Sequence, residues 1–275
     1  MLKGMKVGFQ LYSVRDFAEK NFSETLKKVK EMGYEGVEFA GLYGQEPQEI
    51  KSILDEVGLV PVSAHVPLDT FLEDISGVVN AYKTIGCRYV VIPWLAEDRR
   101  PGNENYEQTL IDIKTVGEEA NKQGMTLLYH NHDFEFVKIG DEYALDLMYQ
   151  GISSDYLQTE IDTCWVNVAG EDPASYIRKY KGRAPVVHLK DFVMPGKKPQ
   201  QLYELIGVSP SKDEEEAEKF EFRPNGYGVQ NFPMILEVAE EAGAGWVIVE
   251  QDSPSMGKTS LECAKMSVDY LNTLK

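Results

Sequence analysis

The sequence has few cysteines and no long apolar segment. Its 275 residues include three cysteines without CxxC spacing, so neither a disulfide framework nor a zinc knuckle is indicated. No window reaches the roughly 20 apolar residues that a membrane-spanning helix needs. The opening stretch MLKGMKVGFQLYSVRD lacks the apolar core and the small-residue cleavage site of a secretory signal. We therefore expect a cytoplasmic protein with no membrane partner.

Basic residues are also scarce. The chain carries 28 Lys and Arg against 45 Asp and Glu, which gives a formal charge of −17, and it has no run rich in Lys or Arg. Proteins that bind nucleic acids need a positive surface to displace counterions from the phosphates. We therefore expect no nucleic-acid partner, and an endonuclease activity is disfavoured for the same reason.

The chain alternates between short apolar runs and segments with helical spacing. Most of the apolar runs are rich in Val, Ile or Leu without polar alternation, as in strands that are covered on both faces. The expected strands are Lys6–Leu11, Gly36–Phe39, Leu59–Ala64, Tyr89–Trp94, Met125–Tyr129, Leu157–Ile161, Pro185–Leu189 and Gly245–Val249. The expected helices are Phe22–Met32, Pro47–Val57, Leu72–Ile85, Tyr106–Gln123, Pro173–Tyr180, Phe232–Ala242 and Leu261–Leu274.

Eight strands that alternate with helices predict a single α/β domain over residues 1–275, a (β/α)8 TIM barrel. A doubly wound sheet would usually carry a glycine-rich phosphate loop after its first strand, where this chain reads QLYSVRD. After the seventh strand, the alternation of strands and helices is interrupted by residues Phe192–Phe222, which include the acidic run DEEEAEKFE. This insertion is either a lid over the active-site face or a charged excursion into solvent.

All four histidines lie at the carboxyl end of an expected strand. His65 ends VPVSAH, His130 and His132 follow MTLLY, and His188 lies in APVVHLK. The enzymes of this barrel class carry their chemistry at the same rim.

Carboxylates follow the same pattern: Glu38, Glu135, Asp162, Asp191 and Glu250 lie at or after strand ends. Such side chains are seldom buried without a partner. One divalent cation balances several carboxylates and also binds neutral imidazole, so the pattern predicts a metal site. A single Asp here also fits a helix N-cap, and a single His or Glu also fits a hydrogen-bonded structural role.

Several motifs, in their order, resemble the xylose isomerase-like TIM barrels, the sugar phosphate isomerase/epimerase group that is related to inosose dehydratase. They are FQLYSVRD, YHNHDFEF, EIDTCW, VVHLKDF, NGYGVQNF and VIVEQD. The resemblance implies one divalent metal held by Glu, Asp, His and Glu from the last four strands. Asp162, His188 and Glu250 match three of these positions. His130 stands where epimerases of the family carry a glutamate, so Glu135 is the expected fourth ligand.

Such a site suits Mn²⁺, Co²⁺, Zn²⁺ or Mg²⁺. The metal would polarise a carbonyl of a sugar or sugar phosphate, and a base would remove the neighbouring proton to form an enediolate. Returning the proton makes the protein an isomerase or epimerase. Loss of a β-substituent makes it a dehydratase or lyase that acts on a keto-inositol or a 3-keto-glycoside. A non-catalytic sugar-binding barrel is the remaining alternative.

The candidate residues fall into two sets. Lys190 either binds a substrate oxygen or forms a salt bridge with Glu160 or Asp191, and the tryptophans either stack on a sugar or pack in the core. The expected partner is a small carbohydrate, and a homo-oligomer is compatible with such barrels. The catalytic candidates are Glu135, Glu250, His132, His130 and Lys190, and the substrate-binding candidates are His65, Gln10, Trp94 and Trp165.

Overall fold

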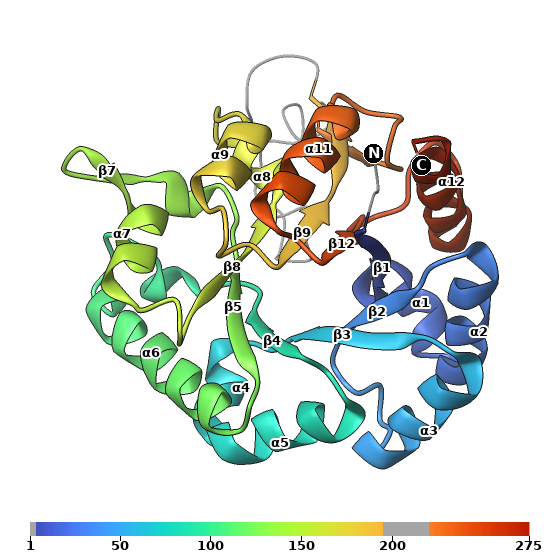
Figure 1. Ribbon diagram of the computed structural model, residues 1–275, viewed down its shortest axis with the longest axis horizontal. Coiled ribbons are helices and arrows are strands. Elements are labelled where there is room, and N and C mark those ends of the chain that lie inside the picture. The colour runs from blue at the N-terminus through green and yellow to red at the C-terminus, as the bar shows by residue number, and fades with distance from the viewer. Residues whose placement is uncertain (1–3, 195–219, 275) are drawn as a thin grey trace, which may run out of the picture.

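The fold is built around a closed barrel of parallel strands (Figure 1). The computed structural model describes residues 4–194 and 220–274. The first and last strands of the barrel pair with each other, which confirms the expected (β/α)8 architecture. In spatial order the barrel consists of β1 (Lys6–Gln10), β12 (Trp246–Val249), β9 (Val186–Leu189), β8 (Gln158–Asp162), β5 (Thr126–His130), β4 (Tyr89–Ile92), β3 (Val60–His65) and β2 (Gly36–Ala40).

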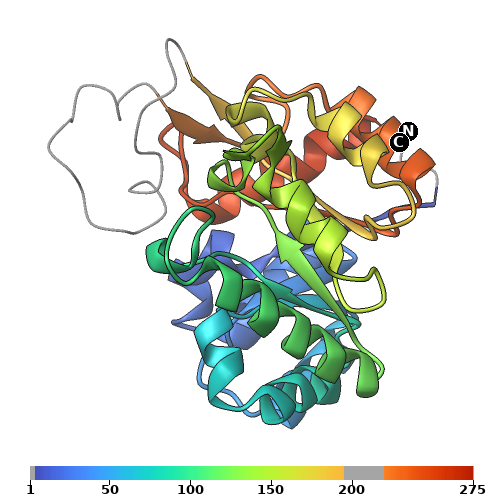
Figure 2. The same ribbon diagram turned by 90° about the vertical axis from the view of Figure 1, so that its left-hand side faces the viewer.

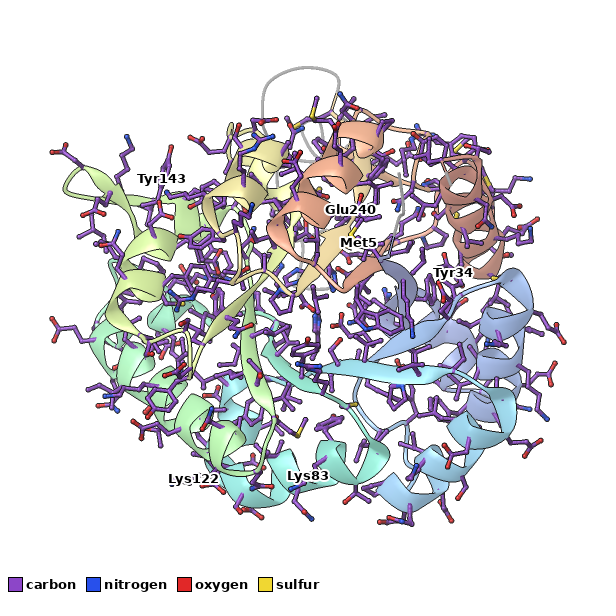
Figure 3. The ribbon with its side chains drawn as sticks, viewed as in Figure 1. Met5, Tyr34, Lys83, Lys122, Tyr143 and Glu240 are labelled. Atoms are coloured by element: carbon purple, nitrogen blue, oxygen red, sulfur yellow. The ribbon has the colours of Figure 1, made fainter. Side chains whose placement is uncertain are left out.

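Helices cover the outside of the barrel (Figures 1 and 2). Figure 3 shows Lys83, Lys122 and Glu240 on this outer layer, where their side chains are exposed. Among the described residues, no helix has the length and apolar content required to cross a membrane. The α-helices are α1 (Arg15–Ala18), α2 (Phe22–Met32), α3 (Pro47–Val57), α4 (Leu68–Glu73), α5 (Ile75–Ile85), α6 (Tyr106–Lys122), α7 (Ala144–Gly151), α8 (Thr163–Val168), α9 (Pro173–Lys179), α11 (Phe232–Ala242) and α12 (Ser260–Thr273). Short 3₁₀ turns lie at Leu11–Val14 (η1), Glu97–Arg99 (η2) and Phe134–Phe136 (η3), and small hairpins are formed by β6 (Lys138–Ile139) with β7 (Glu142–Tyr143) and by β10 (Asp191–Val193) with β11 (Glu221–Arg223).

The bounds of the expected elements agree with the observed ones to within two residues, except for one expected helix that is divided. The expected helix Leu72–Ile85 is two helices, α4 and α5. The break falls at Asp74, whose Oδ1 accepts the Gly77 backbone N–H at 2.9 Å and caps α5. Helices α1, α7 and α8 were not predicted, because they are too short for a clear helical period.

A layer of apolar side chains fills the barrel beneath its carboxyl-end rim. Val62, Tyr89, Val91, Leu128, Val186 and Ile248 form this layer, and Trp246 packs against it. A Cβ atom on Gly8 would lie 2.5 Å from Ile248 Cδ1, and one on Gly36 would lie 2.8 Å from the Trp246 ring. The two glycines therefore make room for these large side chains inside the barrel.

The interruption after the seventh strand begins and ends in the hairpin of β10 and β11. Residues 195–219 lie outside the described part of the chain. The expectation that this insertion forms a lid or a charged excursion therefore stays a prediction. Behind the hairpin, the buried Asp191 carboxylate accepts four backbone N–H groups. They belong to Phe192, Gly226, Gly228 and Gln230, at 2.9 to 3.1 Å.

We expect Asp191→Ala to lower the free energy of unfolding by at least about 3 kcal/mol, because it leaves four N–H groups without their acceptor. For a chain of this size that corresponds to a fall of roughly 6–12 °C in Tm, measured by calorimetry. The control is Asp269→Ala, which removes an exposed helix ion pair with Lys265 and should change Tm little. Equal Tm values for the two variants would contradict the structural role of Asp191.

Candidate metal centre and substrate pocket

The alternation of side chains along the strands places polar groups in two layers at the carboxyl end of the barrel. Residues two apart in a strand point to the same side, so Glu160 and Asp162 of β8 both face the interior. The register pairs Asp162 with His188 of β9, and His188 with Ile248 of β12. This alignment brings side chains from different strands together at two depths.

The outer layer is a group of four potential metal ligands, which we call the outer group: His130, Asp162, His188 and Glu250. One ligand atom from each residue lies within 4.8 Å of all the others, and all four side chains are buried. They come from the ends of β5, β8, β9 and β12. The structure therefore brings together three of the four expected ligands, with His130 as the fourth member.

Asp162 has two separate functions in this group. Its Oδ1 accepts the Trp165 backbone N–H at 3.0 Å, which caps α8. Its buried Oδ2 accepts no hydrogen bond, and it lies 3.4 Å from Lys190 Nζ and 3.6 Å from His130 Nε2. The N-cap role and the role as a candidate ligand thus belong to different oxygens of one carboxylate.

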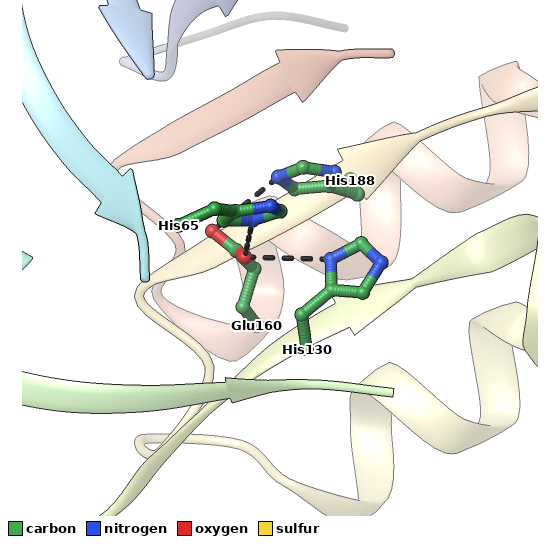
Figure 4. Close-up of side chains that lie close together, drawn as sticks. All are labelled: His65, His130, Glu160 and His188. Carbon is green, nitrogen blue, oxygen red and sulfur yellow. Dashed lines mark hydrogen bonds and ion pairs between the residues drawn. The ribbon is translucent and has the colours of Figure 1, made fainter. Parts of the chain in front are cut away.

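The inner layer, the inner group, consists of Glu38, His65 and Glu160. Figure 4 shows His65 and Glu160 beside His130 and His188, which belong to the outer group. His65 Nε2 lies 2.8 Å from Glu160 Oε2 and 3.0 Å from Glu38 Oε1. Both glutamates are fully buried, so their charges depend on these imidazole contacts.

The imidazoles of His130 and His188 connect the outer and inner groups. In each ring, one nitrogen faces the outer group and the other faces the inner group. His188 Nδ1 lies 3.1 Å from Glu250, and its Nε2 lies 2.7 Å from Glu38 and 3.3 Å from Glu160. His130 Nε2 faces Asp162 at 3.6 Å, and its Nδ1 faces Glu160 at 3.4 Å. Carboxylates on the far nitrogen are what orient a metal-binding imidazole and set its tautomer.

The electrostatics of the histidines differ with their carboxylate contacts. Burial and the positive charge of neighbouring imidazoles hold the pKa of His130 well below its usual value. Burial also opposes the charged form of His65, but Glu38 and Glu160 overcome this effect and raise its pKa to about 10. The same two carboxylates raise the pKa of His188 despite its burial. In the metal-free protein, His130 is therefore neutral, while His65 and His188 balance the inner carboxylates.

Lys190 forms salt bridges, but with partners other than those expected. Its buried Nζ lies 2.8 Å from Glu250, 3.1 Å from Asp252 and 3.4 Å from Asp162. The expectation of Asp191 as a partner is wrong, because that carboxylate turns to the backbone of residues 226–230 instead. Asp252 was not identified from the sequence. Burial raises the pKa of Asp252 to about 6 against the opposing effect of Lys190.

The structure does not bring Glu135 into either group. Glu135 lies in η3, where its carboxylate accepts hydrogen bonds from Tyr129 Oη at 2.5 Å and from the His132 backbone N–H at 2.8 Å. It is fully buried, and burial raises its pKa to about 8. The physical reason is the tight turn after β5, which directs this side chain back toward Tyr129.

Two of the expected substrate-binding residues are enclosed by protein groups. Gln10 is fully buried and donates from Nε2 to Glu38 Oε1 at 2.7 Å. Trp165 is also fully buried, with ring centroids 5.1 Å from His132 and 6.3 Å from Phe220. Neither residue lines the pocket described next.

A pocket of about 610 Å³ opens above the two groups. Of the expected site residues, His65, Trp94, His130, His132, Lys190 and Glu250 line it. Asp252 and Tyr12, which were not predicted from the sequence, also belong to its lining. Its volume is within the range of about 300–1,000 Å³ that is usual for small-molecule sites.

The outer group fits a divalent metal. Its two imidazoles and two carboxylates form a mixed N/O donor set, which is typical of Zn²⁺, Mn²⁺ and related ions. Asp162 Oδ2 is buried and accepts no hydrogen bond, so it can serve as a ligand beside the Lys190 ammonium 3.4 Å away. Five buried carboxylates gather here around Lys190 and the imidazoles, so a further positive charge is favourable: Glu38, Glu160, Asp162, Glu250 and Asp252.

Barrels with such polar groups at the carboxyl ends of their strands form a recognised class of enzymes. A family model described as xylose isomerase-like TIM barrel matches residues 26–274, and the chain belongs to this family. Similar proteins include enzymes named inosose dehydratase, so the expectation that the chain is an enzyme of this barrel family is confirmed.

Three of the similar proteins differ in their named activity and in their sequence identity to this chain. An inosose dehydratase of Geobacillus kaustophilus is 23% identical, over 91% of this chain and 86% of that protein. A solved sugar phosphate isomerase/epimerase of Parabacteroides distasonis has a TM-score of 0.76 and 22% identity, covering 97% of this chain and 98% of its own. A solved IOLI protein with a bound zinc atom has a TM-score of 0.73 and 14% identity, covering 98% of both chains.

We expect Glu135→Gln to remove a pH-dependent loss of stability in the metal-free protein. The folded-state pKa of Glu135 is raised to about 8, so the folded protein favours the protonated carboxyl group. The contribution of this group to the free energy of unfolding is therefore fully present below its ordinary pKa and is lost as pH rises toward 8. Between pH 5 and pH 8, urea unfolding with a chelator should show the wild type losing about 3 kcal/mol relative to the variant.

The matched control is Glu240→Gln, an exposed substitution on α11, which should follow the wild type at both pH values. If Glu135→Gln also follows the wild type, Glu135 does not hold a proton in the folded state.

Proposed function

We propose that the protein is a divalent-metal-dependent enzyme that removes a proton next to the carbonyl of a sugar or sugar phosphate, which gives an enediolate. The observation that carries this proposal is the outer group, with its four ligand atoms within 4.8 Å of one another at the pocket. His132 and Lys190 line the same pocket, which supplies a base and an acid. The sugar class is supported by the names of the relatives.

His130, Asp162, His188 and Glu250 would hold the metal, with Mn²⁺, Co²⁺ or Zn²⁺ favoured over Mg²⁺ because two donors are nitrogen. Bound there, the ion would act as a Lewis acid on the carbonyl and make the neighbouring C–H bond more acidic. Glu38 lies 2.7 Å from the far nitrogen of His188 and Glu160 lies 3.4 Å from that of His130, so these carboxylates would orient the two rings.

His132 is the proposed base. Burial and the nearby Lys190 charge hold its pKa well below the usual value, so the imidazole is neutral and can accept a proton. The ring lies between Phe134 and Trp165, at centroid distances of 5.6 and 5.1 Å, which fixes its plane. Glu250 is less suited to this role because it is one of the four candidate metal ligands, and its carboxylate also lies 2.8 Å from Lys190 Nζ and 3.1 Å from His188 Nδ1.

Lys190 is the proposed cationic group. Burial opposes its charge, but Asp252, Glu250 and Asp162 raise its pKa, so it stays an ammonium. From the pocket wall it would stabilise negative charge on a substrate oxygen or donate a proton to a departing one. Asp252, itself linked through its backbone carbonyl to Arg15, holds the ammonium in position.

A dehydratase or lyase is the second candidate. Epimerisation needs proton transfer at both faces of a carbon, which two similar bases provide. This pocket instead offers a neutral imidazole and an ammonium, a combination that suits removal of a proton with loss of a β-oxygen. The similarity to inosose dehydratases agrees with this outcome.

We expect Asp162→Asn to weaken Mn²⁺ binding by at least about 100-fold, because it removes a charged ligand while the amide oxygen can still cap α8. Isothermal titration calorimetry gives the affinity, and circular dichroism gives the fold. Glu135→Gln serves as the comparison and should retain wild-type affinity. Wild-type affinity in Asp162→Asn would remove Asp162 from the ligand set, and a loss in Glu135→Gln would restore Glu135 to it.

We expect the Mn²⁺-loaded protein to exchange solvent deuterium into keto-sugars or keto-inositols at the carbon beside the carbonyl, as seen by proton NMR in D₂O. His132→Asn should slow the exchange by about 10²- to 10⁴-fold and leave Mn²⁺ affinity unchanged. Unchanged exchange in that variant would exclude His132 as the base. Absence of exchange and of any unsaturated product across such a panel would contradict the proposed function.

A further inference from the structure

The pocket has two walls of different chemistry. Side chains from the ends of β5, β9 and β12, with Tyr12 after β1, form the polar wall. The opposite wall comes from the ends of β2, β3 and β4 and from the helices that follow β3. His65, at the end of β3, also lines the pocket, but its ring nitrogen contacts Glu38 and Glu160 of the inner group. Apart from His65, the residues of this second wall are apolar or aromatic except for Thr70: Ala40, Gly41, Val66, Pro67, Thr70, Tyr82, Pro93 and Trp94. We call it the apolar wall.

The apolar wall is a fixed part of the fold. Val66 and Tyr82 are 2% and 6% exposed, so the core holds both in place. Trp94 follows β4 and is half-buried, and the Arg100 guanidinium lies 5.4 Å from its ring centroid. Gly41, at φ 93°, adds no side chain to the wall.

The pocket is larger than one sugar ring requires. Pockets of about 300–1,000 Å³ take drug-sized ligands, and 610 Å³ lies well within this range. A sugar ring that contacts His132, Lys190 and the outer group fills the polar side alone. The hydroxyl groups of a second sugar would find few partners on the apolar wall, whereas an aromatic or aliphatic group would be buried there favourably.

We propose that the substrate is a glycoside, in which a keto-sugar ring lies at the polar wall and an apolar aglycone lies against Val66, Pro67 and Trp94. The placement of the ring rests on the proposed function, whereas the placement of the aglycone rests on the apolar wall. Such a substrate also supplies a leaving group for the second candidate reaction.

The corresponding reaction is an elimination that releases the aglycone and needs no oxidant, reductant or co-substrate. The C–H bond beside the carbonyl breaks and its proton passes to His132, while its electron pair forms a C=C bond with the neighbouring anomeric carbon. The glycosidic C–O bond breaks, and the departing oxygen takes a proton from Lys190. The products are an unsaturated keto-sugar and the free alcohol of the aglycone.

The test compares methyl and phenyl β-D-glucopyranoside as ligands of the Mn²⁺-loaded protein by calorimetry. Both carry the same ring and lack the carbonyl, so binding is measured without turnover. We expect the phenyl compound to bind about 10- to 100-fold more tightly, as burial of one aromatic ring predicts. Trp94→Ala should remove most of this preference and change the methyl compound less than about twofold.

Val66→Thr, which keeps the side-chain shape and replaces one methyl group with a hydroxyl group, provides a second variant that should reduce the preference. Tyr227→Ala, an exposed substitution outside the pocket, is the control and should retain the full preference. Equal affinity for the two glycosides would overturn the proposal. Equal weakening of both by Trp94→Ala would also overturn it, because Trp94 would then contact the sugar ring.

This result is separable from the proposed function. A phenyl preference without deuterium exchange into any keto compound leaves the apolar wall as an aglycone site and rejects the proposed chemistry. Exchange into free keto-sugars without a phenyl preference supports the chemistry and rejects the aglycone site.

Discussion

Balancing buried negative charge is the constraint on which the carboxyl end of this barrel depends. Isolated carboxylates are costly to bury, and here five of them lie in the two groups and around Lys190. The positive charge in the described part of this region comes from Lys190 and from the imidazoles of His65 and His188. Binding a divalent ion would change this balance, because a ligating imidazole has to be neutral. The protonation of these imidazoles and the binding of a metal ion therefore depend on each other, and the two layers act as one electrostatic unit.

The two layers of that unit follow from strand geometry. Alternation places Glu160 beneath Asp162 on β8, and the register of β8 with β9 sets His188 between the layers. Where β2 meets β3, a register shift leaves Val62 without a partner and puts Ser63 opposite Glu38. Ser63 Oγ then donates a hydrogen bond to that carboxylate. Small irregularities in pairing thus determine which polar groups meet.

The sequence was sufficient for the architecture and for part of the site. Apolar runs that alternate with segments of helical spacing located the barrel strands, and strand-end positions identified Asp162, His188 and Glu250 as neighbours. Glu135 was placed incorrectly beside them, since a five-residue offset does not reveal which way a tight turn directs a side chain. Glu160 and Asp252 were missed as site residues, although Glu160 shares the inward face of β8 with Asp162. Such contacts depend on register and depth, which strand patterns alone do not specify.

The apolar layer beneath the rim restricts the route by which a ligand can reach and leave the pocket. Trp246 and the side chains around it occupy the barrel interior on the amino-terminal side, in space that Gly8 and Gly36 leave open. The pocket above is therefore a chamber with a solid base. In the described residues this layer closes the amino-terminal side, so a ligand would enter and leave by the carboxyl-end face, and two products of the proposed cleavage would depart in sequence.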